Sequence, residues 1–236
     1  MAVYLREISS NKKSFFIWAA AMIAFNIMIF SVYPSFSETM TGFQENFPEA
    51  LLKAVGADRL DLSNILHFYG MEIYLFVTLL GSIYAIILGS GTISREEDYG
   101  TIEFLLSQPL SREKIVTAKV LAAFSYIVIF NILLCLSTYG MLEALAKDGY
   151  GIRAFLLLSL GAFLLHLTFA ALGILISVFI KRARTSISLS LAVVLGTYFL
   201  SVASSISGKL DALIEKLRSL ETRGRLPTEE AIGLSG

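Results

Sequence analysis

Nine charged side chains lie in one short segment of the chain, residues 93–119, between two long apolar stretches. The segment carries both signs of charge together with hydroxyl groups, one glycine and one proline. The chemistry that such a segment offers is charge-assisted contact, and mixed charge suits an interface between separable proteins. It therefore predicts a docking surface for another protein.

Polar side chains are sparse within the apolar stretches, where the candidates are Asn26, Asn131 and His166. His166 could contact a transported substrate, but a packing histidine hydrogen-bonded to a neighbouring helix is the favoured interpretation. No acidic residue in any apolar stretch could pair with it, which argues against an intramembrane enzyme and against proton or sodium coupling. Cys135 is the single cysteine, so we predict no internal disulfide, no metal site and no catalytic residue.

The composition places the chain in a membrane. Hydrophobic residues make up 56% of the sequence and charged residues 16%, and the mean hydropathy is +0.71. A helix needs about 20 apolar residues to cross about 30 Å of hydrocarbon. Five stretches free of Asp, Glu, Lys and Arg approach or exceed that length, at about residues 15–33, 73–93, 120–141, 154–180 and 187–203. Since lipid demands internal hydrogen bonding, we predict an all-α integral membrane protein with about five transmembrane helices.

The distribution of lysine and arginine predicts the orientation. Three groups of basic residues precede the first span, follow the second and follow the fourth: Arg6, Lys12 and Lys13; Arg95, Arg112, Lys114 and Lys119; Lys181, Arg182 and Arg184. We therefore expect the N-terminus and the 93–119 loop to be cytoplasmic. Residues 34–72 would form a large external loop with a surface helix at 48–56, and residues 209–220 would form an amphipathic helix. Residues 1–8 would lie as an amphipathic helix at the membrane surface.

Local signals predict a short helix within the charged loop. Ser94 and Glu97 have the spacing of a capping box, which would place the acidic residues that follow Arg95 in a first helical turn. Gly100 would then break or bend that helix. A solvated surface helix with no partner is the generic alternative for such a pattern.

The end of the loop is predicted from similar signals. Pro109 would end the short helix, and Ser111 would cap the third span. Leu110 and Ile115 are spaced as a hydrophobic staple around that cap.

Taken together, the loop residues resemble the cytoplasmic loop of ABC-2 type permeases. The matching positions are Ile93, Glu97, Gly100, Thr101, Glu103, Leu105, Leu106, Ser107, Pro109, Ser111, Arg112, Ile115 and Lys119. The resemblance covers residues 1–207 and implies the membrane subunit of an ATP-driven transporter, an exporter in the plasma membrane. The sequence has no G-x-x-x-x-G-K-[ST] loop, so ATP and Mg would bind to a separate ABC ATPase. No nucleic-acid partner is expected.

The resemblance also implies residue roles. The loop after the second span would be a coupling helix that docks in a groove of the ATPase, with Arg182 and Arg184 as further candidate contacts. The docking residues would be Arg95, Glu96, Glu97, Asp98, Gly100, Thr101, Glu103, Phe104, Leu105 and Leu106. Pro109, Ser111 and Arg112 would shape the loop, while Asn26, Asn131 and His166 are candidates for the transport pathway.

Two stripes of small residues predict close helix packing. Gly81, Ala85 and Gly89 recur at every fourth position in the second span, and Ser188, Ala192 and Gly196 do so in the fifth. By the resemblance, the pathway forms between two membrane subunits, in a homodimer or with a second permease. Either stripe could lie at that contact or pack within one subunit.

The chain departs from the family in the number of spans, because ABC-2 permeases usually have six. We therefore expect a membrane domain at residues 1–207 and an amphipathic helix with a polar, extracytoplasmic tail at 208–236. A non-transporting scaffold or a truncated permease remnant is the alternative function.

Overall fold

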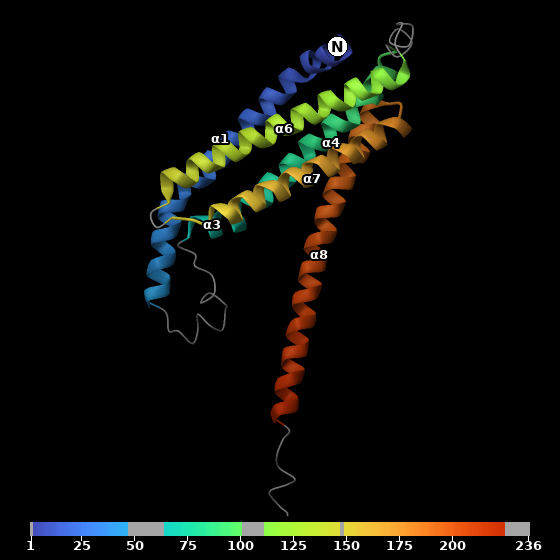
Figure 1. Ribbon diagram of the computed structural model, residues 1–236. Helices are drawn as coiled ribbons and strands as arrows, with labels where there is room; N and C mark the ends of the chain where they lie inside the picture. Colours follow the sequence, from blue (N-terminus) through green and yellow to red (C-terminus); the bar gives the residue numbers. More distant parts are fainter. Residues whose placement is uncertain (1, 47–63, 101–110, 147–148, 225–236) are drawn as a thin grey trace, which may run out of the picture. The chain divides into compact units, whose positions relative to one another are not determined.

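The computed structural model describes residues 2–46, 64–100, 111–146 and 149–224. Every regular element in these ranges is helical (Figure 1). The elements are α1 (Ala2–Asn46), α3 (Ile65–Phe68), the π-helical turn η1 (Tyr69–Ile73), α4 (Tyr74–Asp98), α6 (Arg112–Leu145), α7 (Ile152–Phe179) and α8 (Ala183–Gly224).

Five helical segments of the described chain are long and apolar enough to cross a membrane. They are Val3–Thr39, Ile65–Asp98, Arg112–Leu145, Ile152–Phe179 and Ala183–Ser204. The predicted all-α membrane fold with five spans is therefore confirmed. The spans could be predicted from the sequence because an apolar run of this length has few alternatives to a helix in lipid.

Two of the predicted helix boundaries are wrong. Residues 1–8 do not form a separate surface helix, because α1 continues from Ala2 without interruption, and Pro34 does not end it. Proline removes one backbone hydrogen bond and clashes with the preceding turn, which bends a helix without necessarily ending it. Figure 1 shows α1 as a bent helix. The predicted helix at 48–56 lies outside the described residues, and residues 209–220 are helical as part of α8.

The chain divides into two compact units, residues 1–194 and 195–236. Within the first unit the most extensive contacts join α4 to α7 and α1 to α6, and α6 also packs on α7 (Figure 1). In the second unit, α8 continues to Gly224 and the side chains of residues 195–204 are mostly exposed.

Small residues allow α4 and α7 to approach closely. A Cβ atom added at Gly89 would overlap the carbonyl oxygen of Ala170, and one added at Gly173 would overlap that of Ile86. A Cβ at Gly81 would overlap the His166 ring. The small-residue stripe of the second span therefore packs within the subunit, which decides between the two alternatives for that stripe.

Aromatic rings gather near the start of the second span. The rings of Phe30 and Tyr69 stack at a centroid distance of 6.2 Å and an angle of 6°, and Phe68 contacts Tyr33 and Phe36. These contacts join the middle of α1 to α3 and η1, and offset stacking adds to the stability gained by burial.

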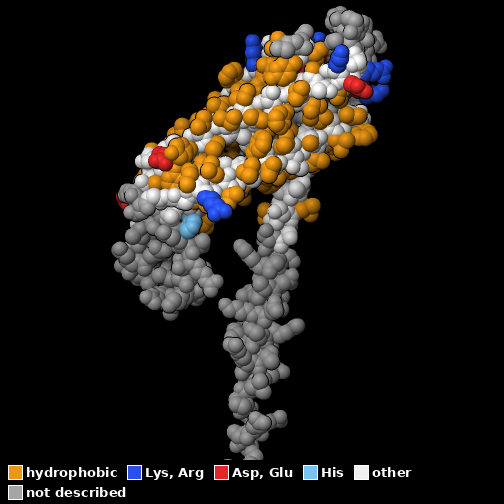
Figure 2. All heavy atoms as spheres, in the orientation of Figure 1, with side chains coloured by type: hydrophobic (Ala, Val, Ile, Leu, Met, Phe, Trp, Pro, Cys, Tyr) orange, Lys and Arg blue, Asp and Glu red, His pale blue; other side chains and the backbone are white. Residues whose placement is uncertain are grey.

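The outer surface of the helices in the first unit is apolar, as expected of a surface that faces lipid. Figure 2 shows hydrophobic side chains covering the flank of these helices, with most of the visible lysine and arginine side chains at one end. Phe16, Ile17, Leu136 and Leu157 are among the large apolar side chains more than half exposed. Such a continuous apolar surface is incompatible with water and suits a bilayer.

We expect Gly89→Ala to lower the unfolding temperature of the purified protein. The new Cβ would have to displace the α7 backbone at Ala170, and overpacking of this kind costs about 1–3 kcal/mol. Gly140→Ala on α6 is the matched control, because nothing lies within 4 Å of the added Cβ there. Thermal unfolding in detergent, followed by intrinsic fluorescence, should show destabilisation in the first variant only. Equal unfolding temperatures would contradict the close α4–α7 packing.

Candidate functional site

The charged loop begins inside α4, so the predicted capping box is wrong. Ser94 lies within the helix, fully buried, and its hydroxyl donates to the Ser90 carbonyl one turn earlier. Because the Ser94 hydroxyl is hydrogen-bonded within the helix, it does not act as the N-cap of a new helix. The helix continues through Asp98, five residues past the end predicted for the span.

This extension reverses the electrostatic setting of the acidic residues. Glu96, Glu97 and Asp98 occupy the last turn of α4 instead of the first turn of another helix. The C-terminal end of a helix carries partial negative charge, so carboxylates there need compensation from cations. A lysine on a neighbouring helix supplies it for Glu96.

Gly100 ends the helical path, as its position in the sequence predicts. Its φ is +66°, a left-handed conformation that costs little only for glycine. The amide of Tyr99 donates to the Arg95 carbonyl (3.0 Å) and that of Gly100 to the Glu97 carbonyl (3.2 Å). These bonds satisfy two of the last carbonyls of α4.

The loop returns to the membrane at Ser111, whose predicted role as a helix cap is confirmed. The Ser111 hydroxyl accepts from the amide of Lys114 at 3.4 Å, and α6 begins at Arg112. Ile115 is buried, as a staple residue would be. Residues 101–110 lie outside the described chain, and with them the predicted contacts and loop residues Thr101, Glu103, Phe104, Leu105, Leu106, Pro109 and Leu110.

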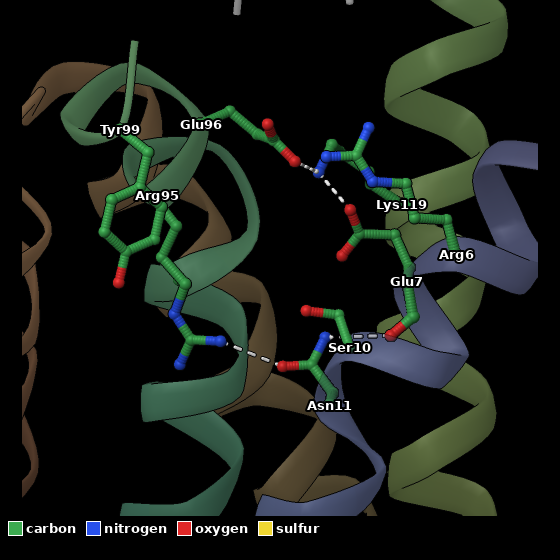
Figure 3. Close-up of a pocket in the computed structure, with 9 residues that line it drawn as sticks. Arg6, Glu7, Ser10, Asn11, Arg95, Glu96, Tyr99 and Lys119 are labelled. Carbon is green, nitrogen blue, oxygen red and sulfur yellow. Dashed lines mark hydrogen bonds and ion pairs between the residues drawn. The ribbon is translucent and has the colours of Figure 1, made fainter. Parts of the chain in front are cut away.

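Lys119 joins the two ends of this loop to the N-terminal helix. Its ammonium group forms ion pairs with Glu7 on α1 and with Glu96 on α4, the latter at 3.2 Å (Figure 3). The Lys119 side chain is only 5% exposed, and the two glutamates are 13% and 14% exposed. A buried ammonium needs such partners, because an unpaired charge in this environment is strongly unfavourable.

Arg95 adds a second connection between α1 and α4. Its guanidinium donates to the Asn11 side-chain oxygen at 2.9 Å, and the Asn11 amide in turn donates to the Glu7 carbonyl at 3.2 Å. Figure 3 shows these side chains converging from α1, α4 and α6. We call Glu7, Asn11, Arg95, Glu96 and Lys119 the loop-base cluster.

Two tyrosines bind the beginning of α1 to α6 beside this cluster. The Tyr126 hydroxyl donates to the Ile8 carbonyl, and the hydroxyls of Tyr4 and Ser125 lie 3.0 Å apart. The first turns of α1 are thereby held against the start of α6. A displacement of the loop ends must also move α1 or break these bonds.

The second basic turn lies at the same end of the first unit as the loop base. The Ser186 hydroxyl at the start of α8 donates to the Ser90 carbonyl of α4 at 3.1 Å. Arg182 and Arg184 are exposed. Their predicted role as contacts of a partner protein stays a prediction.

The three polar residues predicted for the pathway are engaged in helix contacts. Asn26 on α1 donates to Thr138 on α6 at 2.7 Å. His166, fully buried on α7, lies 2.9 Å from the Asn131 oxygen on α6 and 3.2 Å from the Val77 carbonyl on α4. The favoured interpretation of His166, hydrogen bonding to neighbouring helices, is confirmed. A role in transport stays a prediction for all three residues.

The space around Asn131 is too small to bind a small molecule. The cavity beside Asn131 and Thr138 has a volume of about 10 Å³, which is too small for more than a single water molecule. Among the described residues no group of three or more His, Cys, Asp or Glu side chains could hold a metal ion.

Sequence reasoning missed the roles of Glu7, Asn11 and Lys119. Lys119 contributes to the predicted orientation and to the loop resemblance, but no ion pair is predicted for it. A signal was nevertheless present, because Ile115, Lys119, Ala122 and Tyr126 share the helical spacing of the buried face of α6. A lysine on such a face predicts an acidic partner.

The helices and the loop-base cluster define a multi-pass, all-α membrane protein whose charged interhelical loop is held at both ends. A family described as "ABC-2 family transporter protein" matches residues 1–216. The chain therefore belongs to the ABC-2 transporter family, and it is the membrane component of an ABC transporter. No curated protein and no solved structure shows significant similarity to it.

We expect Lys119→Met to destabilise the protein by about 3–5 kcal/mol, the usual cost of removing one partner of a buried ion pair. Glu7 and Glu96 would then lose the ammonium group that pairs with both of them. The matched control is Lys114→Met, an exposed lysine on the same helix, for which we expect a change of about 0.5 kcal/mol or less. Urea unfolding in mixed micelles would measure both, and Glu7→Gln added to Lys119→Met should recover part of the loss. Equal stability of the two lysine variants would contradict the buried ion pair.

Proposed function

We propose that this permease subunit exports its substrate with energy from a separate ABC ATPase, which docks on the loop between α4 and α6. The observation that carries the proposal is the loop-base cluster. Lys119 connects both ends of the loop to α1, so a force applied to the loop acts on three membrane helices at once.

Physical reasons support a docking role for this loop. Arg95, Glu96 and Glu97 are half-buried and fixed by the helix, whereas Asp98 and Tyr99 are exposed beyond it. An element with exposed charge on a rigid base can bind a partner and transmit its movement, because little of the movement is lost in bending the base. ATP and Mg²⁺ would bind to the ATPase.

The orientation follows from the same end of the molecule. The N-terminal helix, both ends of the charged loop and the start of α8 are hydrogen-bonded or ion-paired to one another there. These segments carry the three basic groups of the sequence. By the positive-inside rule we place this end in the cytoplasm and the chain in the plasma membrane. Export as the direction of transport rests on the family resemblance.

A second membrane subunit completes the proposal. Ser188 and Ala192 on α8 are exposed, and nothing lies within 4 Å of a Cβ added at Gly196. The small-residue stripe of the fifth span is therefore available for close approach by another helix. We propose that this stripe contributes to a contact with a second copy or with a related permease.

Docking can be tested with two glycines of matched conformation. Gly100 and Gly149 both have positive φ, +66° and +77°, and a Cβ meets nothing within 4 Å at either. Proline requires φ near −65° and therefore distorts both turns. We expect Gly100→Pro to lose the co-purifying ATPase and ATP hydrolysis, and Gly149→Pro to retain both.

The measurement is affinity purification from the native host in mild detergent, with mass spectrometry of stoichiometric partners. Equal protein recovery and equal helical circular dichroism would show that both variants are folded. If wild-type protein carries no ATPase, the transporter proposal fails and the scaffold alternative gains support. If Gly100→Pro keeps its ATPase, docking occurs elsewhere.

A further inference from the structure

A cavity of about 130 Å³ opens beside the loop-base cluster, between α1, α4 and α6. Five charged side chains line it: Arg6, Glu7, Arg95, Glu96 and Lys119. Figure 3 shows the charged ends of Glu7, Glu96, Lys119 and Arg6 gathered together, with the Arg95 guanidinium turned toward Asn11. At about 30 Å³ per water molecule, the volume equals about four waters and is comparable to a phosphate group.

The negative charges that line this cavity are ion-paired, whereas two of its positive charges are not. Both carboxylates are paired with Lys119. Arg95 contacts only the neutral Asn11 side chain, and Arg6 forms no ion pair or hydrogen bond within the described part of the chain. The cavity therefore has one net positive charge and two guanidinium groups with free donors. Two arginines with this donor capacity suit the oxygens of a phosphate.

The shape of α4 helps to direct one of these arginines into the cavity. Gly91 lies one turn before Arg95, and a Cβ added there would lie 2.6 Å from the Arg95 Nε. The absence of a side chain thus lets the guanidinium fold back along α4 toward α1. Ser10 and Tyr99 also line the cavity.

The cavity lies at the boundary between polar and apolar surface. Ser10 and Lys13 are exposed on α1, and Phe16 and Ile17, exposed by 67% and 69%, follow within two turns. On α6, Val116 and Val120 are exposed beside Lys119. A helix rises about 1.5 Å per residue, so the cavity is within about 10 Å of lipid-facing side chains. This is the depth at which headgroup phosphates lie.

We propose that this cavity binds a phosphate group with a single negative charge, supplied by the headgroup of an anionic phospholipid. Its oxygens accept from Arg6 and Arg95, and its charge balances the net charge of the cavity. The bound phosphate would connect α1 to α4 directly at the base of the loop, so lipid composition would tune the rigidity of that base. The proposal concerns binding alone and does not depend on an ATPase.

The test compares Arg6→Gln and Arg95→Gln with Lys13→Gln. Lys13 is an exposed cation on α1 that does not line the cavity. Full-length protein, with any co-purifying subunits retained, is placed in phosphatidylcholine nanodiscs. Lipid retention is measured by native mass spectrometry with phosphatidylglycerol added, and in a second arm thermal stabilisation by inorganic phosphate is measured.

We expect each arginine variant to bind phosphatidylglycerol about tenfold more weakly than wild type, the usual effect of losing one charge-assisted hydrogen bond. Lys13→Gln should bind within about twofold of wild type. Stabilisation by inorganic phosphate alone, lost in the arginine variants, would retain the phosphate site but assign it a soluble ligand. If both arginine variants behave as Lys13→Gln does with both probes, the proposal is overturned. Arg6→Gln keeps the test decisive even if Arg95→Gln misfolds, since Arg6 is exposed and forms no ion pair or hydrogen bond within the described residues.

Discussion

The buried ammonium group of Lys119 is the constraint on which the loop-bearing end of the first unit depends. It is held by Glu7 and Glu96, which come from α1 and α4, and loss of the ammonium would remove the cation that the two carboxylates share. Because the three helices meet there, the end of α4 and the beginning of α6 cannot move independently of α1. Hydrogen bonds from Arg95 to Asn11 and from Tyr126 to Ile8 reinforce the same junction. A charged loop that moves with its helices is what ATP-driven coupling in an ABC transporter requires.

Close backbone packing extends this constraint along the membrane. α4 carries the loop base at one end and contacts α7 along the stripe that contains Gly81 and Gly89. His166 fills the space opposite Gly81 and reaches both Val77 and Asn131. The helix that carries Arg95 and Glu96 at its charged end is thus packed tightly against a second helix in the apolar region. Interdigitated packing of this kind transmits displacement because it has little compressibility.

Features that depend on neighbouring residues could be predicted from the sequence. Contacts that depend on residues far apart in the chain could not. The five spans follow from the lengths of apolar runs, and the turn at Gly100 and the cap at Ser111 follow from residue type. Ser94 was misassigned because a capping pattern cannot reveal that the preceding turn already offers an acceptor. The pairing of Lys119 could not be predicted, because its partners lie 112 and 23 residues away along the chain. No local pattern places Glu7 beside it, although the apolar periodicity of α6 shows that Lys119 faces inward.

The central claim, that the end of the molecule bearing Lys119 is cytoplasmic and receives the ATPase, can be tested by photo-crosslinking in native membranes. A photoreactive amino acid is placed at Asp98, exposed at the end of α4, and in a second protein at Glu143, exposed near the opposite end of α6. Crosslinked partners are identified by mass spectrometry. The account predicts an ABC ATPase attached to position 98 and none attached to position 143. An ATPase captured at position 143, or at neither position in a membrane where the ATPase is present, would contradict it.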